Sequence, residues 1–195
     1  MEIDHSVEAT KARMQVRRDA LLSALPDDFK AREDGLPARI RGENASLQTK
    51  LGRIYALVDE YSALRAPYVA CREGCADCCR MNVQISSIEA ARIERATGRK
   101  ARALTRSLRY DDGKFAGVAC PFLKEDACSI YEQRPFVCRN HASLDVDAHW
   151  CDPQRMATVK LPLVELGGVK QAMLEVMVQS KQPVLADIRD FFPIT

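Results

Sequence analysis

The sequence predicts a mainly α-helical protein with little or no β structure and a loop-rich region in its middle. Two observations predict this fold class. Apolar residues recur at helical spacing in several parts of the 195-residue chain, whereas few segments alternate with a period of two. All eight cysteines fall between Cys71 and Cys151, where these helical patterns are interrupted. A chain of this length buries about two-thirds of its unfolded surface, so an apolar core is available without help from metal.

Two helices are predicted in the first third of the chain. The first runs from about Ser6 to Leu25 and ends at Pro26. The second has a stronger apolar stripe and ends before Pro67. This stripe consists of Leu47, Leu51, Ile54, Val58, Tyr61 and Leu64. Between the two helices, residues 27–44 (DDFKAREDGLPARIRGEN) are polar and contain Gly and Pro, which predicts a linker or loop.

The cysteine region also contains one predicted helix and one predicted strand. Ser86 followed by Glu89 matches a capping box, and the helix that it starts should end before Gly98. Residues 81–86 (MNVQIS) are the best candidate for a short strand. Residues 99–109 (RKARALTRSLR) contain five basic residues, which we interpret first as the solvated face of a short helix and second as a patch for phosphate or an acidic partner.

The last region begins with Asp152 and Pro153, which suit an N-cap and a first helical position. A further helical stripe follows at Val169, Met173 and Val176. The chain therefore divides into an N-terminal helical segment (residues 1–66), a cysteine-cluster metal-binding region (67–152) and a C-terminal helical segment (153–195). We expect the three to pack into one compact unit.

Charge and the N-terminal residues restrict the partners and the compartment. The chain has 29 Lys and Arg against 27 Asp and Glu, and this net charge of +2 gives no field that would attract nucleic acid or a membrane surface. The first residues lack the apolar stretch of a secretory signal, and no apolar run reaches the roughly 20 residues that span a bilayer. We therefore expect a cytoplasmic protein, in which thiols stay reduced and structural disulfides are uncommon.

Clustered thiols in a reducing compartment indicate metal ligands. Cys75 and Cys78 form a CxxC pair, in which a tight turn aims two thiolates at one metal while backbone amides stabilise the sulfurs. A thioredoxin-like redox pair would follow an apolar strand, which residues 68–74 (YVACREG) do not resemble. The candidate ligands are Cys71, Cys75, Cys78, Cys79, Cys120, Cys128, Cys138 and Cys151. They suit two four-cysteine sites, or one cluster with extra ligands beside it.

The adjacent pair Cys78 and Cys79 indicates more than one metal atom. Side chains of consecutive residues diverge by about 100 degrees in a helix and point to opposite faces in a strand. Both thiols are therefore not expected to bind one mononuclear ion together with Cys75. Three arrangements remain open: the two serve different metals, they bind different atoms of one polynuclear cluster, or one of them is a buried residue that binds no metal.

Histidines and arginines near the cysteines are the remaining candidates. His141 and His149 are either ligands or hydrogen-bond partners of the site, whereas His5 has no neighbours in sequence that suggest a role. Four arginines stand beside or near the thiols and either offset their negative charge or are simply solvated. These are Arg72, Arg80, Arg134 and Arg139.

The order of these motifs resembles the YkgJ-type cysteine-cluster family, a zinc- or iron-chelating domain of bacteria. The motifs are CREGCADCC (71–79), the helix with Glu89, CPFL (120–123), and Cys128 to Arg139 with Tyr131 and Arg134-Pro135 between them. The resemblance implies metal binding through the seven cysteines from Cys71 to Cys138. Asn140 and His141 depart from the aromatic residue common in the family. Cys151 lies beyond the matched part, and its inclusion rests on proximity and the even count.

Three functions are consistent with these observations. The first is a metalloprotein that holds an iron–sulfur cluster, of the 4Fe–4S type, or neighbouring metal sites, and that serves electron transfer with a redox partner or metal-dependent chemistry. The second is a zinc-stapled structural or interaction module, in which residues 99–109 or an outer helix contact a protein partner. The third follows from a similar cysteine arrangement in flagellin lysine methylases and is a cluster-dependent methyltransferase-like enzyme acting on protein. The sequence names no substrate and leaves open whether the protein is an enzyme, an oxidoreductase or transferase.

Overall fold

The computed structural model describes residues 2–72, 74–111 and 113–194. Of these residues, 53% are helical and 5% lie in strands, which confirms the mainly α fold. No described helix is both long enough and apolar enough to cross a membrane. The α-helices are α1 Val7–Ala24, α2 Asp27–Gly42, α3 Leu47–Arg65, α4 Ser87–Thr97, α5 Phe136–Asn140, α6 Pro153–Met156, α7 Gly167–Val178 and α8 Ile188–Phe191. The 3-10 helices are η1 Ala66–Tyr68, η2 Asp77–Arg80, η3 Tyr131–Gln133 and η4 His149–Cys151. The strands are β1 Gln84–Ser86, β2 Leu123–Lys124, β3 Ala127–Cys128 and β4 Leu185–Asp187.

Both helices predicted in the first third of the chain are confirmed, and their N-caps are serines. The side chain of Ser6 accepts a hydrogen bond from the amide of Ala9 at the start of α1. At the start of α3, the side chain of Ser46 accepts one from the amide of Thr49. Each cap satisfies an amide that has no partner inside its own helix. The stripe predicted for the second helix faces the core, since Leu51, Ile54, Val58 and Tyr61 are buried there.

The linker predicted over residues 27–44 is wrong, because α2 occupies residues 27–42 of it. Its buried side chains recur at helical spacing and hold the segment against the rest of the protein; they are Phe29, Glu33, Leu36 and Ile40. Pro37 lies inside this helix. A proline there removes the hydrogen bond to the carbonyl of the residue four positions earlier, but tertiary packing of the apolar side chains outweighs that cost.

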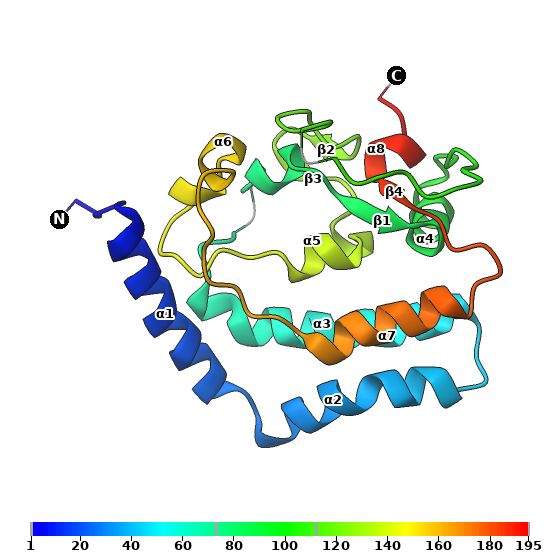
Figure 1. Ribbon diagram of the computed structural model, residues 1–195, viewed down its shortest axis with the longest axis horizontal. Coiled ribbons are helices and arrows are strands. Elements are labelled where there is room, and N and C mark those ends of the chain that lie inside the picture. Colours follow the sequence, from blue (N-terminus) through cyan, green and yellow to red (C-terminus); the bar gives the residue numbers. More distant parts are fainter. Residues whose placement is uncertain (1, 73, 112, 195) are drawn as a thin grey trace.

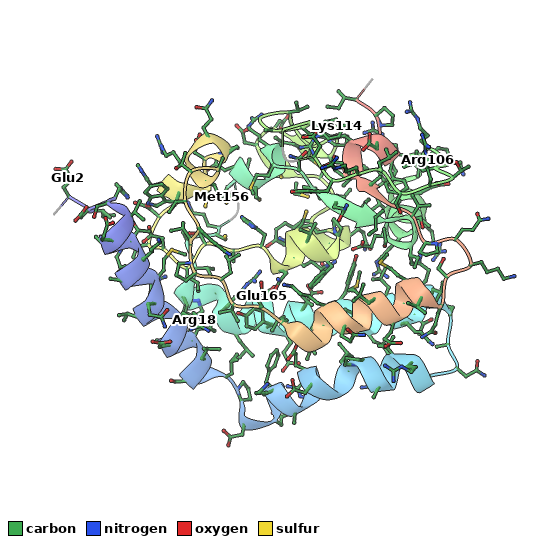
Figure 2. The ribbon with its side chains drawn as sticks, in the orientation of Figure 1. Glu2, Arg18, Arg106, Lys114, Met156 and Glu165 are labelled. Atoms are coloured by element: carbon green, nitrogen blue, oxygen red, sulfur yellow. The ribbon has the colours of Figure 1, made fainter. Side chains whose placement is uncertain are left out.

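The helices α2, α7 and α3 lie side by side below α5, and the short thiol-bearing elements lie on the other side of α5 (Figure 1). Side chains fill the space between these layers (Figure 2). One apolar core joins α1, α2, α3 and α7, with Ile88 of α4 and Leu144 at its edge. The helical layer therefore forms a platform under the cysteine region.

A second apolar core lies beside the cysteines and combines the middle of the chain with its C-terminal end. The predicted strand is confirmed as β1, which pairs antiparallel with β4 so that Ile85 lies opposite Ala186. The capping box of Ser86 and Glu89 is present at the start of α4, and Gly98 ends that helix with a φ of 73°. Cys120, Cys128 and Cys138 pack against this second core. The C-terminal end thus helps to form the walls around three thiols.

The basic segment 99–109 is not helical, so the short helix expected there is wrong. The segment is instead extended along the C-terminal end, where Arg102 donates its amide to the carbonyl of Phe191 and Leu108 donates to that of Leu185. Arg99 is held inward by the carbonyls of Pro121 and Pro193. Arg102, Arg106 and Arg109 are exposed, in agreement with a solvated basic face, and Figure 2 shows Arg106 projecting outward.

The last predicted elements are confirmed. The Asp152 carboxylate caps α6 by accepting hydrogen bonds from the amides of Gln154 and Arg155, and Pro153 occupies the first helical position. The stripe of Val169, Met173 and Val176 is buried on α7. Strand β4 was not predicted. It is only three residues long, too short to show a periodic pattern in the sequence.

Candidate metal centre

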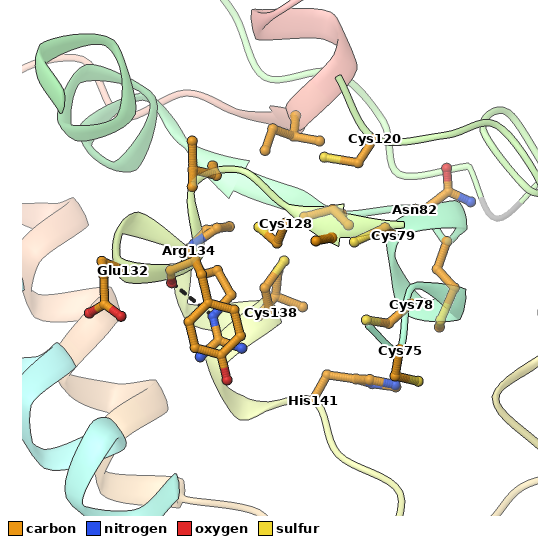
Figure 3. A pocket seen from close by; sticks show the side chains of 18 of the residues that line it. Cys75, Cys78, Cys79, Asn82, Cys120, Cys128, Glu132, Arg134, Cys138 and His141 are labelled. Carbon is orange, nitrogen blue, oxygen red and sulfur yellow. Dashed lines mark hydrogen bonds between the residues drawn. The ribbon is translucent and has the colours of Figure 1, made fainter. Parts of the chain in front are cut away.

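Six of the eight cysteines line one cavity of about 470 Å³. They are Cys75, Cys78, Cys79, Cys120, Cys128 and Cys138. Figure 3 shows their side chains around this cavity, with His141 and Arg134 also at its wall. Cys75 lies just before η2, and Cys78 and Cys79 lie in it. Cys120 comes from the loop before β2, Cys128 from β3 and Cys138 from α5, about sixty residues after Cys75. The fold therefore brings together thiols that the sequence places in two separate blocks.

Four of these thiols form a compact set, which we call the inner thiol group: Cys79, Cys120, Cys128 and Cys138. Backbone contacts fix their relative positions. The amide of Cys120 donates to the carbonyl of Cys79 at 2.7 Å. The β2–β3 hairpin then places Cys128 opposite Leu123, three residues after Cys120. Cys138 reaches the set from α5, which packs on α3. In Figure 3 the sulfurs of Cys79, Cys128 and Cys138 point into the same space.

The electrostatics of the inner thiol group favour a bound cation. Burial raises the pKa of Cys138 well above its ordinary value, and the other three thiols of the group raise it further. Burial raises the pKa of Cys120 to about 11 and also raises that of Cys128. Every pair in the group repels in this way, so four thiolates are unfavourable here without a positive charge between them. A metal supplies that charge and displaces the thiol protons.

Three of the sulfurs already receive a hydrogen bond from a backbone amide two residues further along the chain. The amide of Asp77 donates to Cys75, that of Phe122 to Cys120, and that of Ile130 to Cys128. Such bonds favour the thiolate and so lower the pKa of each thiol, in opposition to burial. They also fix the direction in which the sulfur points. Hydrogen bonds of this kind orient thiolate ligands and tune the metal that they bind.

We call the other four cysteines the outer thiol group: Cys71, Cys75, Cys78 and Cys151. Two of them, Cys75 and Cys78, also line the cavity. Ser143 connects the segment that carries Cys71 to the segment that carries Cys151. The amide of Ala70 donates to the carbonyl of Ser143 at 2.9 Å. The hydroxyl of Ser143 is hydrogen-bonded to the thiol of Cys151. Burial raises the pKa of Cys151 to about 12, and the neighbouring Cys71 and Cys75 raise it further.

The adjacent cysteines behave differently from the sequence expectation. Cys78 and Cys79 lie in the 3-10 helix η2 and both line the cavity, so their side chains do not diverge to opposite faces. The two sulfurs are hydrogen-bonded to each other, which raises the pKa of Cys78 and lowers that of Cys79. Cys78 also lies close enough to Cys138 and Cys71 to be influenced by both. Cys78 is therefore the junction between the inner and outer thiol groups.

Residues 70–154 match the family model CxxCxxCC, described as a putative zinc- or iron-chelating domain. This segment is similar to that family model. The match confirms the resemblance to a cysteine-cluster family, and it extends beyond the motifs recognised in the sequence to include Cys151. The description supports metal binding and leaves zinc and iron as alternatives. Neither the curated proteins nor the solved structures contain a significant match to the chain.

Arg189 is a buried cation bonded to the cysteine region, and sequence reasoning missed it because it lies 110 residues after Cys79. The residue is 3% exposed, and its guanidinium donates to the carbonyls of Cys79, Met81 and Val118. Its positive charge lowers the pKa of Cys79, after the larger effect of the hydrogen bond from Cys78. No motif in the sequence marks this arginine, because its position depends on the pairing of β4 with β1.

The four arginines predicted from the sequence have different places. Arg72 and Arg134 line the cavity, and Arg134 stacks on the ring of Tyr131 at 3.4 Å. Arg80 pairs with Asp126 at 3.7 Å, and together with Arg134 it lowers the pKa of Cys79. Arg139 lies outside the cavity wall and holds the fold, since it pairs with Asp59 and donates to two backbone carbonyls. Three of the four arginines therefore act on the thiols.

The three histidines lie in different places relative to the thiols. His141 lines the thiol cavity, and in Figure 3 its imidazole extends toward Cys75 and Cys78. Burial and then the charge of Arg65 lower the pKa of His141, so its imidazole is neutral near pH 7. His149 does not line the cavity but stacks on His5 with 3.9 Å between ring centroids. His5, which had no expected neighbours, also lies 3.5 Å from Asp147. His141 alone among the three faces the thiols.

Proposed function

We propose that the cysteine region holds an iron–sulfur cluster of the 4Fe–4S type through the inner thiol group and that the protein transfers electrons. Four cysteine thiolates are the usual ligand set of such a cluster. The inner thiol group supplies four thiols from four different elements around one cavity. This convergence is the observation that carries the proposal.

The size of the cavity fits a cluster better than a single ion. A zinc ion with bonds of about 2.3 Å draws its four sulfurs to within about 3.8 Å of one another. In the described part of the chain, a set of three ligand atoms all within 4.8 Å of one another occurs at His5, Asp145 and Asp147 and at no set of three thiols. The thiols instead surround about 470 Å³ of space. The ligand set and its spacing therefore suit a polynuclear centre.

The walls of the cavity suit electron transfer. Protein charge and hydrogen bonds to the sulfurs set the reduction potential of a cluster. The amides that donate to Cys120 and Cys128 and the positive charge of Arg189 beside Cys79 would all stabilise the reduced, more negative state. Tyr131 and Val137 line the cavity and are exposed, so the centre would lie close to the protein surface, where a redox partner has access.

Anaerobic reconstitution with iron and sulfide tests this function. We expect a brown protein with iron and acid-labile sulfide in equal amounts, and a reduced content of both in the variant Cys138→Ser. Tyr131→Phe is a matched control, because it changes a cavity residue that offers no sulfur, and it should retain the full iron content. A colourless protein with stoichiometric zinc from both aerobic and anaerobic preparations would contradict the proposal.

A zinc-stapled structural module is the second candidate function, favoured by one observation in the fold. Residues 99–111 and 113–119, as described, contain no helix or strand and lead to Cys120, so a metal there would fix a long irregular segment. In that case zinc would contribute directly to folding. Zinc content and loss of the fold on chelation would support this function over electron transfer.

A further inference from the structure

We propose that the outer thiol group forms a second metal centre of its own, with Cys71, Cys75, Cys78 and Cys151 as ligands. The centre would take an iron–sulfur cluster rather than a single zinc ion, because no three thiols in the described part of the chain lie within 4.8 Å of one another. This inference rests on the proposed function only in treating the thiols as metal ligands, and it adds a second site to the one that the inner thiol group forms.

The number of thiolates that one metal centre takes argues for a second centre. A structural zinc ion and a 4Fe–4S cluster each take four protein thiolates. The inner thiol group already supplies four, so a single centre there leaves no position for four further cysteines. Every pair of the inner thiols lies within electrostatic range. The inner centre is therefore complete without the outer thiols.

The surroundings of Cys151 do not match those of a cysteine in an apolar core. Its side chain is buried at 6% exposure, yet among the described residues neither of the two apolar cores includes it. Its neighbours are instead the thiols of Cys71 and Cys75 and the hydroxyl of Ser143. Cys151 is therefore buried and lies beside two other potential ligands.

Contacts between distant segments assemble the outer thiol group. The carbonyl of Ser143 accepts the amide of Ala70 and so ties the residue before Cys71 to the segment that leads to η4. Helix α6, directly after Cys151, contacts η2, which carries Cys78. The amide of Cys75 closes a turn by donating to the carbonyl of Arg72 at 3.1 Å. Local turns and long-range contacts therefore bring Cys71 near Cys75, Cys78 and Cys151.

A second centre would explain why Cys78 and Cys79 are adjacent. Cys79 belongs to the inner thiol group, whereas Cys78 lies between that group and Cys71. If each residue binds a different centre, one peptide bond links the two centres covalently. Their sulfurs lie within hydrogen-bonding distance, so the two metals would also be close in space. His141, which extends toward Cys75 and Cys78, would contact the outer centre.

Metal analysis of cysteine variants of the full-length protein tests the second centre. The wild-type protein, reconstituted anaerobically with iron and sulfide or with zinc, is compared with Cys71→Ser, Cys151→Ser and Cys138→Ser. With two equal centres, each variant should retain about half of the wild-type metal. A variant that combines Cys151→Ser with Cys138→Ser should retain almost none. Loss of all metal from each single variant would instead indicate one shared centre and would overturn the proposal.

Cys71→Ser keeps this test independent of folding, because Cys71 is exposed and its substitution leaves no cavity in a core. Far-ultraviolet circular dichroism should match that of the wild type. If the wild-type protein holds metal and both outer variants retain all of it, the second centre is disproved while the inner centre stands. If the wild-type protein holds no metal under any condition, both proposals fail.

Discussion

The guanidinium of Arg189 donates a hydrogen bond to the carbonyl oxygen of Cys79, with 3.2 Å between nitrogen and oxygen. Arg189 lies at the start of α8 and pairs with Asp187 at 2.9 Å, where both side chains are buried. The other oxygen of Asp187 accepts the amide of Val83 at 2.6 Å. The C-terminal end of the chain thus fixes the segment that carries the adjacent cysteines.

Substitution of Arg189 by methionine should destabilise the protein and weaken metal binding together. The change leaves the Asp187 carboxylate buried without its partner, which costs about 3–5 kcal/mol in the free energy of unfolding. Arg189→Lys should lose less of the free energy of unfolding than Arg189→Met, because lysine keeps the positive charge. It should still fall short of the wild type, because lysine has no planar guanidinium that can donate to several acceptors at once. Urea unfolding and metal content measure both effects. Lys114→Met is the control, since the Lys114–Asp190 pair is more exposed and should contribute less than about 1 kcal/mol.

The Glu89 carboxylate offers a second test, because it accepts hydrogen bonds from three different elements. One oxygen accepts from the hydroxyl of Tyr55 on α3 and from the amide of Phe136, the first residue of α5. The other accepts the amide and hydroxyl of Ser86. Glu89→Gln turns one acceptor into a donor that faces donors, so we expect a loss of about 1–3 kcal/mol in unfolding free energy.

The same substitution should reduce metal retention, because α5 carries Cys138 and begins at the amide that Glu89 holds. Metal release to a chelator should be faster in Glu89→Gln than in the wild type. Glu94→Gln is the control from the same helix, since its partners Lys100 and Ala101 lie outside the cavity. Equal release rates from the two variants would show that Glu89 does not position α5.

The contact between α2 and α7 predicts the effect of a single methyl group. Pro37 cannot donate to the carbonyl of Glu33, four residues earlier in α2. That carbonyl lies against Gly168, where an added Cβ would stand 2.1 Å from its oxygen. Gly168→Ala should therefore lower the melting temperature, by at least several degrees if the helices separate by the required distance. Gly167→Ala is the control in the same turn, because its Cβ meets nothing within 4 Å. A higher melting temperature for Gly168→Ala would contradict this packing.

The sequence predicted most of the helices because their apolar stripes are long and regular, as in α3 with Leu51, Ile54 and Val58. It failed at α2, where Gly35 and Pro37 suggest a loop although Phe29, Leu36 and Ile40 repeat with helical spacing. Breaker residues are local signals, whereas burial against α7 depends on a segment more than one hundred residues later. Tertiary packing therefore decided the structure of this segment.

The candidate site was predicted in its residue types but not in its arrangement. Clustering and the CxxC spacing indicated the thiols, because ligand motifs are local. The division into inner and outer groups was not visible, since it depends on the hydrogen bonds from Cys120 to Cys79 and from Ala70 to Ser143. Arg189 was missed for the same reason. Contacts between distant segments follow from topology, which a single sequence does not specify.

The pKa values of the thiols predict opposite pH dependences for the metal-free and metal-loaded protein. In the metal-free protein, burial raises the pKa of Cys120 from 9.0 to about 11 and that of Cys151 from 9.0 to about 12. A raised pKa means that the folded state holds the proton more tightly than the unfolded state. The stability from these thiols is therefore fully present below about pH 9 and is lost as the pH rises toward 11 and 12.

In the metal-loaded protein the ligating thiols carry no protons, so this loss at high pH should be absent. Protons instead compete with the metal, and loading should weaken as the pH falls below neutrality. Thermal unfolding between pH 6 and 10.5, with and without reconstituted metal, measures both trends. The variant Cys120→Ser should flatten the high-pH decline of the metal-free protein, because it removes a group that titrates there. Parallel pH profiles for the two forms would show that these thiols do not bind the metal, because ligation must remove their titration.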